Sequence, residues 1–177
     1  MKKTKTRNKQ PLLNSALKRD LLSLFIKIAL IAGSVFMLFT FVFGVYYYKD
    51  PTMTPAIQDG DLILYYRWDK SYSAQDTIIL EYQGERQIRR IVASAGNIVD
   101  ITEDGLIVDG ARQQEPRIYT KTERYDTGID FPYVVPEDSV FVLADDREDT
   151  VDSRVYGSVR IEDTLGKIMG VFRRRGI

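Results

Sequence analysis

The chain has 177 residues, of which 44% are hydrophobic and 28% charged, a balance typical of a folded protein with one ordinary domain and a smaller segment. It contains no histidine and no cysteine. Disulfides, a Ser-His-Asp triad, a Cys-His dyad and the usual zinc sites are therefore excluded. The first 27 residues hold eight basic side chains and one acid, which leaves 17 basic and 24 acidic residues in the rest of the chain.

The clearest element is an apolar segment near the N-terminus. Residues 28–48 are 21 consecutive uncharged residues, which as a helix span roughly 30 Å, the thickness of a membrane core. The run is too long for a signal peptide, and no small-residue cleavage site follows it before Lys49. We expect a transmembrane helix over 28–48, with Tyr46, Tyr47 and Tyr48 at the membrane interface.

The charge asymmetry predicts the topology. Residues 1–27 form a basic tail, and the excess of Lys and Arg before an apolar helix indicates a cytoplasmic N-terminus. We expect a single-pass cell-membrane protein whose residues 49–177 lie outside the cell. A nucleic-acid partner is not expected, because the cationic tail is explained by membrane topology and the body is acidic.

Residues 49–177 are expected to be mainly β, as antiparallel sheets or a partly closed barrel. Short runs of β-branched and aromatic residues alternate with turn formers such as Asp59-Gly60 and Asp104-Gly105. Residues 111–132 are charged and contain Pro116, so a long loop is expected there. The predicted strands are 62–66, 77–80, 87–92, 98–101, 106–108 and 140–143.

Little catalytic chemistry remains after this elimination. A serine/lysine dyad needs neither histidine nor cysteine, because a buried lysine can take the proton from a serine hydroxyl. Four acidic residues in turns could instead form an acid/base or metal cluster, but acidic surface turns are common and no metal or cofactor is expected. These residues are Asp50, Asp145, Asp146 and Asp149.

Three segments carry a resemblance to one family. Residues 52–61, TMTPAIQDGD, resemble the type I signal peptidase box S-M-x-P-T-L-x-x-G-D. Residues 89–97, RRIVASAGN, resemble its K-R-V-I-G-x-P-G-D box, and residues 144–157, ADDREDTVDSRVYG, resemble G-D-N-x-x-x-S-x-D-S-R-x-x-G. Because the three boxes occur in order behind an N-terminal anchor, the chain resembles the Gram-positive form of this family.

The resemblance implies a degenerate active site. The nucleophilic serine falls on Thr52, and the general-base lysine falls on Arg89, whose guanidinium stays protonated at physiological pH. The serine that orients the lysine falls on Thr150. The hydroxyl of the oxyanion hole falls on Asp50, whose carboxylate would repel a developing oxyanion.

The scaffold positions match the family. The resemblance implies ion pairs between Asp145 and Arg90 and between Asp152 and Arg154. Met53 is either a core residue or a contact near the membrane and the substrate, and Pro55 of the same box is also expected to contact the membrane or the substrate.

Two functions remain open. The favoured one is a proteolytically inactive membrane protein that binds secreted precursors in an extended form, as a chaperone or docking factor. Such a protein resembles the signal-peptidase-like factors of Gram-positive pilus assembly, which implies a pilin precursor as client and a sortase as a possible partner. The alternative is an atypical signal peptidase with Thr52 as nucleophile and Asp50 or another carboxylate as base.

Overall fold

The computed structural model describes residues 10–148 and 150–173, with side chains from Leu17 onward. The chain divides into two compact units, one before and one after residue 42. The first contains helix α1 (Gln10–Met37), which runs into a π-helical turn, η1 (Leu38–Val42). The segment Leu17–Val42 is long and apolar enough to cross a membrane, and its side chains are not packed in a protein core.

The end of the apolar run differs from the sequence prediction. Strand β1 (Phe43–Tyr47) follows the π-helical turn and pairs antiparallel with β2 (Leu62–Tyr66). The expected helix over 28–48 is therefore wrong at its last residues, where aromatic and β-branched side chains suit a strand equally well. Tyr48 is also not an interface residue, because its side chain is fully buried in the core of the second unit. Of the expected basic tail, residues 1–9 lie outside the described part, whereas residues 10–27 belong to α1.

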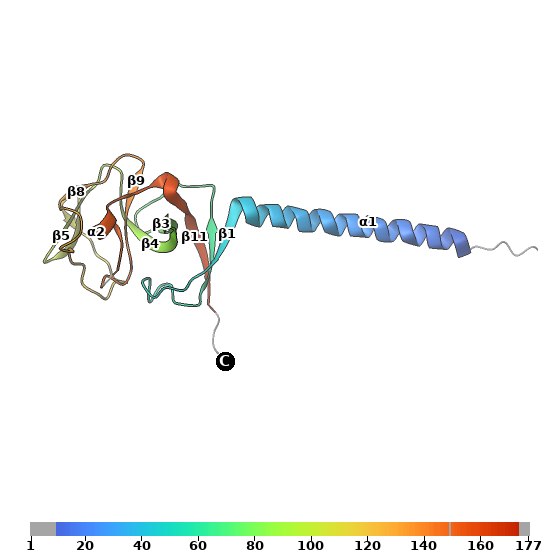
Figure 1. Cartoon of the computed structure of the whole chain (residues 1–177), viewed down its shortest axis with the longest axis horizontal. Coiled ribbons are helices and arrows are strands. Elements are labelled where there is room, and N and C mark those ends of the chain that lie inside the picture. Colours follow the sequence, from blue (N-terminus) through green and yellow to red (C-terminus); the bar gives the residue numbers. More distant parts are fainter. Residues whose placement is uncertain (1–9, 149, 174–177) are drawn as a thin grey trace, which may run out of the picture. The chain divides into compact units, whose positions relative to one another are not determined.

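The second unit contains two antiparallel sheets among the described residues (Figure 1). In spatial order, the larger sheet is β1, β2, β11 (Thr164–Phe172), β3 (Thr77–Tyr82), β4 (Glu85–Ser94), β9 (Ser139–Leu143) and β10 (Val159–Arg160). The smaller sheet is β7 (Ala111–Arg112), β6 (Gly105–Val108), β5 (Ile98–Thr102) and β8 (Tyr133–Val134). Two short helices, α2 (Ser153–Tyr156) and the 3-10 helix η2 (Ile161–Asp163), complete the unit. The predicted mainly β, antiparallel fold is confirmed.

The larger sheet curves so that its edge strand β1 approaches β4. Tyr48, which follows β1, and Ile88 of β4 belong to the same buried apolar cluster. At the rim of this cluster the Tyr46 hydroxyl donates to the Arg86 carbonyl at 3.4 Å. No ladder joins β1 to β4 in the described residues, so the sheet stays open between them.

The pairing of β4 changes along its length. All of Glu85–Arg90 pairs with β3, but the ladder with β9 begins only at Arg90. Among the described residues, Glu85–Arg89 therefore has no strand partner on the β9 side. This half-open edge ends at Arg89.

Candidate functional site

Thr52 and Arg89 lie together although 37 residues separate them. Thr52 belongs to the turns after β1, and Arg89 lies at the end of the open half of β4. Arg89 Nη1 donates to Thr52 Oγ1 at 3.0 Å. The same turn also contacts residues 144–157, the third segment that resembles the family, because Asp146 N donates to the Thr52 carbonyl at 2.9 Å. The fold thus assembles the two positions that the sequence resemblance pairs.

The Arg89 guanidinium is buried, with only 2% of the residue exposed, and it donates four hydrogen bonds. Nε and Nη2 both donate to the Val151 carbonyl, at 3.3 and 2.9 Å. Nη1 also donates to the Ile88 carbonyl at 2.7 Å. Arg89 therefore joins β4, the Thr52 turn and the segment before α2. Since a guanidinium only donates, it cannot remove the proton from Thr52.

A second hydroxyl contacts Thr52. Tyr48 Oη lies 3.2 Å from Thr52 Oγ1. Burial raises the pKa of the Tyr48 phenol far above its ordinary value. The phenol is therefore neutral at physiological pH and is not a base for Thr52.

The Asp50 carboxylate accepts a hydrogen bond from the backbone amide of Thr52, the residue at the family's nucleophile position. Asp50 Oδ1 accepts a hydrogen bond from Thr52 N at 2.9 Å, and Oδ2 lies 4.0 Å from Arg89 Nη1. About a third of this side chain is exposed, at 34%. A carboxylate thus lies between an N–H donor and a cation, at the position that the family resemblance assigns to the oxyanion hole.

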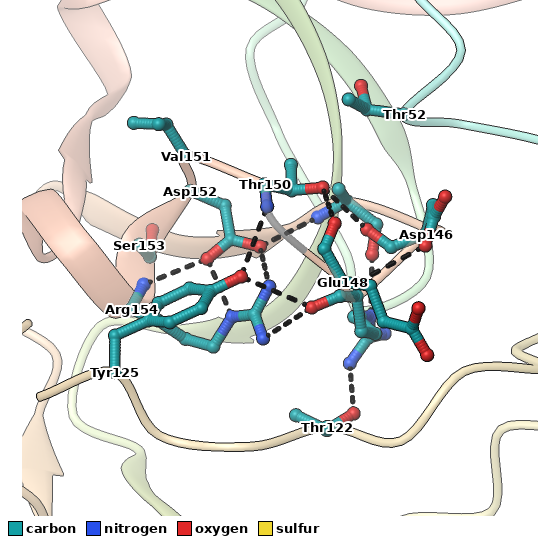
Figure 2. A network of polar contacts seen from close by, with 12 residues as sticks. Thr52, Thr122, Tyr125, Asp146, Glu148, Thr150, Val151, Asp152, Ser153 and Arg154 are labelled. Atoms are coloured by element: carbon teal, nitrogen blue, oxygen red, sulfur yellow. Dashed lines mark hydrogen bonds and ion pairs between the residues drawn. The ribbon is translucent and has the colours of Figure 1, made fainter.

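Thr150 does not orient Arg89, contrary to what the family pattern implies. Its hydroxyl is directed to the carbonyls of Asp146 and Glu148, each at 2.9 Å (Figure 2). The Val151 carbonyl holds the guanidinium instead. A guanidinium carries several donors in a fixed planar arrangement, and two of them converge on this one carbonyl.

The two expected ion pairs are both formed. Arg90 meets Asp145 in a buried bidentate pair at 2.7 and 2.6 Å, and this hydrogen bonding raises the pKa of Arg90. Arg154 meets Asp152 at 2.9 Å through both of its contacts. Asp152 also caps α2, since its Oδ1 accepts from Arg154 N at 3.0 Å. These pairs fix the strands and the helix around the site.

The loop after β7 contacts the segment around Thr150 through Tyr125 (Figure 2). The Tyr125 hydroxyl donates to the Arg147 carbonyl at 3.2 Å and accepts from Thr150 N at 3.1 Å. The Tyr125 ring lies against the Arg154 guanidinium, 4.4 Å from it. Arg147 is itself buried and pairs with Glu115 at 2.5 Å. The expected loop over 111–132 is therefore a strap that supports the segment carrying Val151.

Met53 and Pro55, which also belong to residues 52–61, differ in burial. Met53 is fully buried beside Tyr48 and Ile88, so it is a core residue and not a contact for a membrane or a substrate. Pro55 is exposed and follows a cis peptide bond. Within the described residues no group of three or more acidic side chains could hold a metal ion, and Asp149 lies outside them.

Sequence reasoning missed Val151 and Tyr48. Val151 acts through its backbone carbonyl, which carries no signature in the sequence. Tyr48 was assigned to the membrane interface because it ends the apolar run.

The fold and the site define an antiparallel β protein that brings a hydroxyl and a basic side chain together and that follows an apolar N-terminal helix in the chain. The family model for "Signal peptidase, peptidase S26" matches residues 20–172. The chain therefore belongs to this family.

The chain is also similar to individual proteins. Signal peptidase IB of Staphylococcus aureus is 26% identical over 170 residues, which cover 86% of this chain and 89% of the relative. Signal peptidase I of Bacillus amyloliquefaciens is 27% identical over 123 residues, which cover 64% of this chain and 66% of the relative. A crystal structure of a signal peptidase I from Enterococcus faecalis is similar with a TM-score of 0.46 and 26% identity, over 56% of this chain and 97% of the other. Together with the apolar helix, the family indicates a membrane-anchored protein.

Proposed function

We propose that this chain is a proteolytically inactive signal-peptidase-like protein that binds extended segments of secreted precursors. Its N-terminus lies in the cytoplasm and the β unit lies outside the cell membrane. The observation that carries the proposal is the replacement of a base by Arg89, which donates to Thr52 at 3.0 Å beside a half-open strand edge.

Inactivity follows from the contacts of the Thr52 hydroxyl. Its two described neighbours are a guanidinium, which only donates, and a neutral phenol. An atypical peptidase with Asp50 as base is less well supported, because the Asp50 carboxylate accepts from the Thr52 amide and faces Arg89. A general base must reach the proton that it removes.

Binding follows from the open half of β4. The turn between β3 and β4 is Gln83-Gly84, with positive φ at both residues, so Tyr82 and Glu85 form a hydrogen-bonded pair. By alternation, Arg86 and Ile88 direct their backbone groups away from β3. Arg89 already donates to the Ile88 carbonyl, whereas Arg86 is exposed and, among the described residues, its carbonyl accepts only the long bond from Tyr46. An extended peptide can add to this edge at Arg86 by displacing Tyr46.

Within this function we propose a pilin precursor as the client and a sortase as a neighbouring partner in surface pilus assembly. The motivation is the resemblance of a degenerate family member to pilus-assembly factors. Co-expression of a pilin precursor and its sortase with the wild-type chain or with Thr52→Ala tests it. Equal pilus polymer with both forms and none without the chain is expected, and loss of polymer with Thr52→Ala contradicts it.

The binding edge is tested with the full chain in detergent micelles and a synthetic signal-peptide fragment that contains an Ala-x-Ala segment. Arg86→Pro removes an N–H that faces away from β3 and therefore leaves the β3 ladder intact. We expect it to weaken peptide binding by about tenfold or more, as for loss of a main-chain hydrogen bond in a strand-addition site. Arg86→Ala, which removes only the guanidinium, is the matched control and should keep binding close to that of the wild type.

The same mixtures are analysed for cleavage by mass spectrometry. No cleaved fragment is expected from the wild type or from either Arg86 variant. Cleavage by the wild type that Thr52→Ala abolishes would establish a peptidase and overturn the inactive assignment.

A further inference from the structure

The carboxylate of Asp50 lies between a backbone N–H donor and a guanidinium, a position that suits an anion. Its Oδ1 takes the N–H of Thr52 at 2.9 Å, and its Oδ2 faces the Arg89 guanidinium at 4.0 Å. Most of the nearby donors are already used, because Arg89 donates four hydrogen bonds, to the carbonyls of Val151 and Ile88 and to the hydroxyl of Thr52. A second anion would therefore compete with Asp50 for a guanidinium that is mostly bonded within the chain.

A peptide that follows the open edge of β4 must pass this carboxylate. The edge runs from Arg86 through Ile88 to Arg89, and Arg89 contacts both Thr52 and Asp50. The amide of an uninterrupted peptide is neutral and tolerates the neighbouring carboxylate. A peptide that ends there places its terminal carboxylate beside Asp50, and the two like charges share a single guanidinium whose bonds are already made.

We propose that Asp50 is a specificity-determining residue that makes the site accept intact segments running past Thr52 and reject peptides that end there with a free carboxylate. The inference rests on the proposed peptide-binding function and defines its ligand class as uncleaved precursor rather than cleaved product. The Asp50 carboxylate occupies the position that the terminal carboxylate of such a peptide would otherwise take.

The test compares three peptides of one sequence, each labelled at its N-terminus, on the full chain in detergent micelles. One ends in a free carboxylate after the Ala-x-Ala segment, the second ends there in an amide, and the third continues for about eight residues, long enough to cross the site as an extended strand. Fluorescence anisotropy gives the three dissociation constants. We expect the amide and the extended peptide to bind at least about tenfold more tightly than the free carboxylate, about 1.4 kcal/mol.

Asp50→Asn keeps an oxygen acceptor for the Thr52 amide and removes the charge. It should bring the dissociation constant of the carboxylate peptide to within about threefold of that of the amide peptide, because the like-charge repulsion is lost. Asp59→Asn changes the net charge equally at an exposed neighbouring turn and should keep the wild-type ratio. If Asp50→Asn does not fold, Asp50→Ser, which also removes the charge and keeps an oxygen, takes its place with the same expected ratio.

The outcomes separate the two proposals. Equal binding of the carboxylate and amide peptides by the wild type overturns the role of Asp50 while leaving the peptide-binding function intact. A ratio that persists in Asp50→Asn overturns it as well. Absence of binding by all three peptides refutes the peptide-binding function, and the specificity inference with it.

Discussion

Arg89 Nη1 donates a hydrogen bond to Thr52 Oγ1 at 3.0 Å, so the position of a general base holds a group that donates toward the nucleophile position. The same guanidinium also connects three segments of the chain through the carbonyls of Ile88 and Val151. Chemistry and structure are therefore linked in a single side chain, and the two can be separated by mutation.

Restoring the family's dyad alone is expected to fail. Thr52→Ser with Arg89→Lys supplies a nucleophile and a possible base, but Asp50 still occupies the Thr52 amide. We expect cleavage of a signal-peptide substrate near background for this double variant. Adding Asp50→Ser should increase it by about 100-fold, the usual effect of one oxyanion-hole donor. Strong cleavage by the double variant would show that Asp50 does not obstruct the oxyanion position.

Arg89 is expected to stabilise the β unit. Arg89→Met leaves the carbonyls of Val151 and Ile88 without their buried donor. We expect the free energy of unfolding to fall by about 2 to 3 kcal/mol, measured by urea titration of the full chain in detergent. Arg112→Met, at an exposed strand position, should change it by less than about 0.5 kcal/mol. Equal effects of the two substitutions would contradict the connecting role of Arg89.

The ion pair beneath α2 is expected to matter more than an exposed pair nearby. Asp152→Ala leaves the Arg154 guanidinium buried and without its carboxylate partner, and it also removes the helix cap. A loss of about 3 to 5 kcal/mol is expected in the same titration. Asp163→Ala breaks an exposed pair with Arg160 and should cost less than about 1 kcal/mol. Comparable losses would mean that burial does not control the strength of these pairs.

The pair between Asp61 and Arg173 predicts a pH dependence. The hydrogen bonds from Arg173 hold the pKa of Asp61 below its ordinary value. This contribution to stability is present above the ordinary pKa of aspartate, about 4, and is lost as the pH falls through the lowered value. Asp61→Asn should therefore reduce stability by about 1 kcal/mol at pH 7, because Asp61 is buried and its partner is half-exposed.

Thermal unfolding at several pH values measures this difference. It should shrink toward zero as the medium is acidified below the lowered pKa, since both forms are then neutral at this position. Asp59→Asn, an exposed neighbour, is the control. A difference for Asp61→Asn that stays constant from pH 7 to strongly acidic solution would contradict the assignment.

Much of the second unit could be predicted from the sequence because its strands are short, β-branched and separated by turn formers. Residues 62–66, 77–80 and 140–143 are strands where expected. Strand β1 could not be predicted in this way, because a continuous apolar run has no period that separates the end of a helix from the start of a buried strand. Its partner β2 and the burial of Tyr48 decide its conformation.

The site divides in the same manner. The resemblance of three short segments to the family was enough to predict that Thr52 and Arg89 lie together, because the family motifs specify the side chains at those positions. The carbonyl of Val151 carries no such mark, and neither does the buried Arg147, which occupies an unspecified position of the third segment. Contacts made by backbone atoms and by unspecified positions require the folded chain.

The four hydrogen bonds of Arg89 also affect how easily this position can change by mutation. Any single step back toward catalysis at this position removes carbonyl contacts immediately, while the gain needs at least two other changes, at Thr52 and Asp50. Under the proposed function, sequences that carry only one of these changes are expected to be less stable and still inactive. A return to proteolysis would therefore need several changes together, the first of which lowers the stability of the fold.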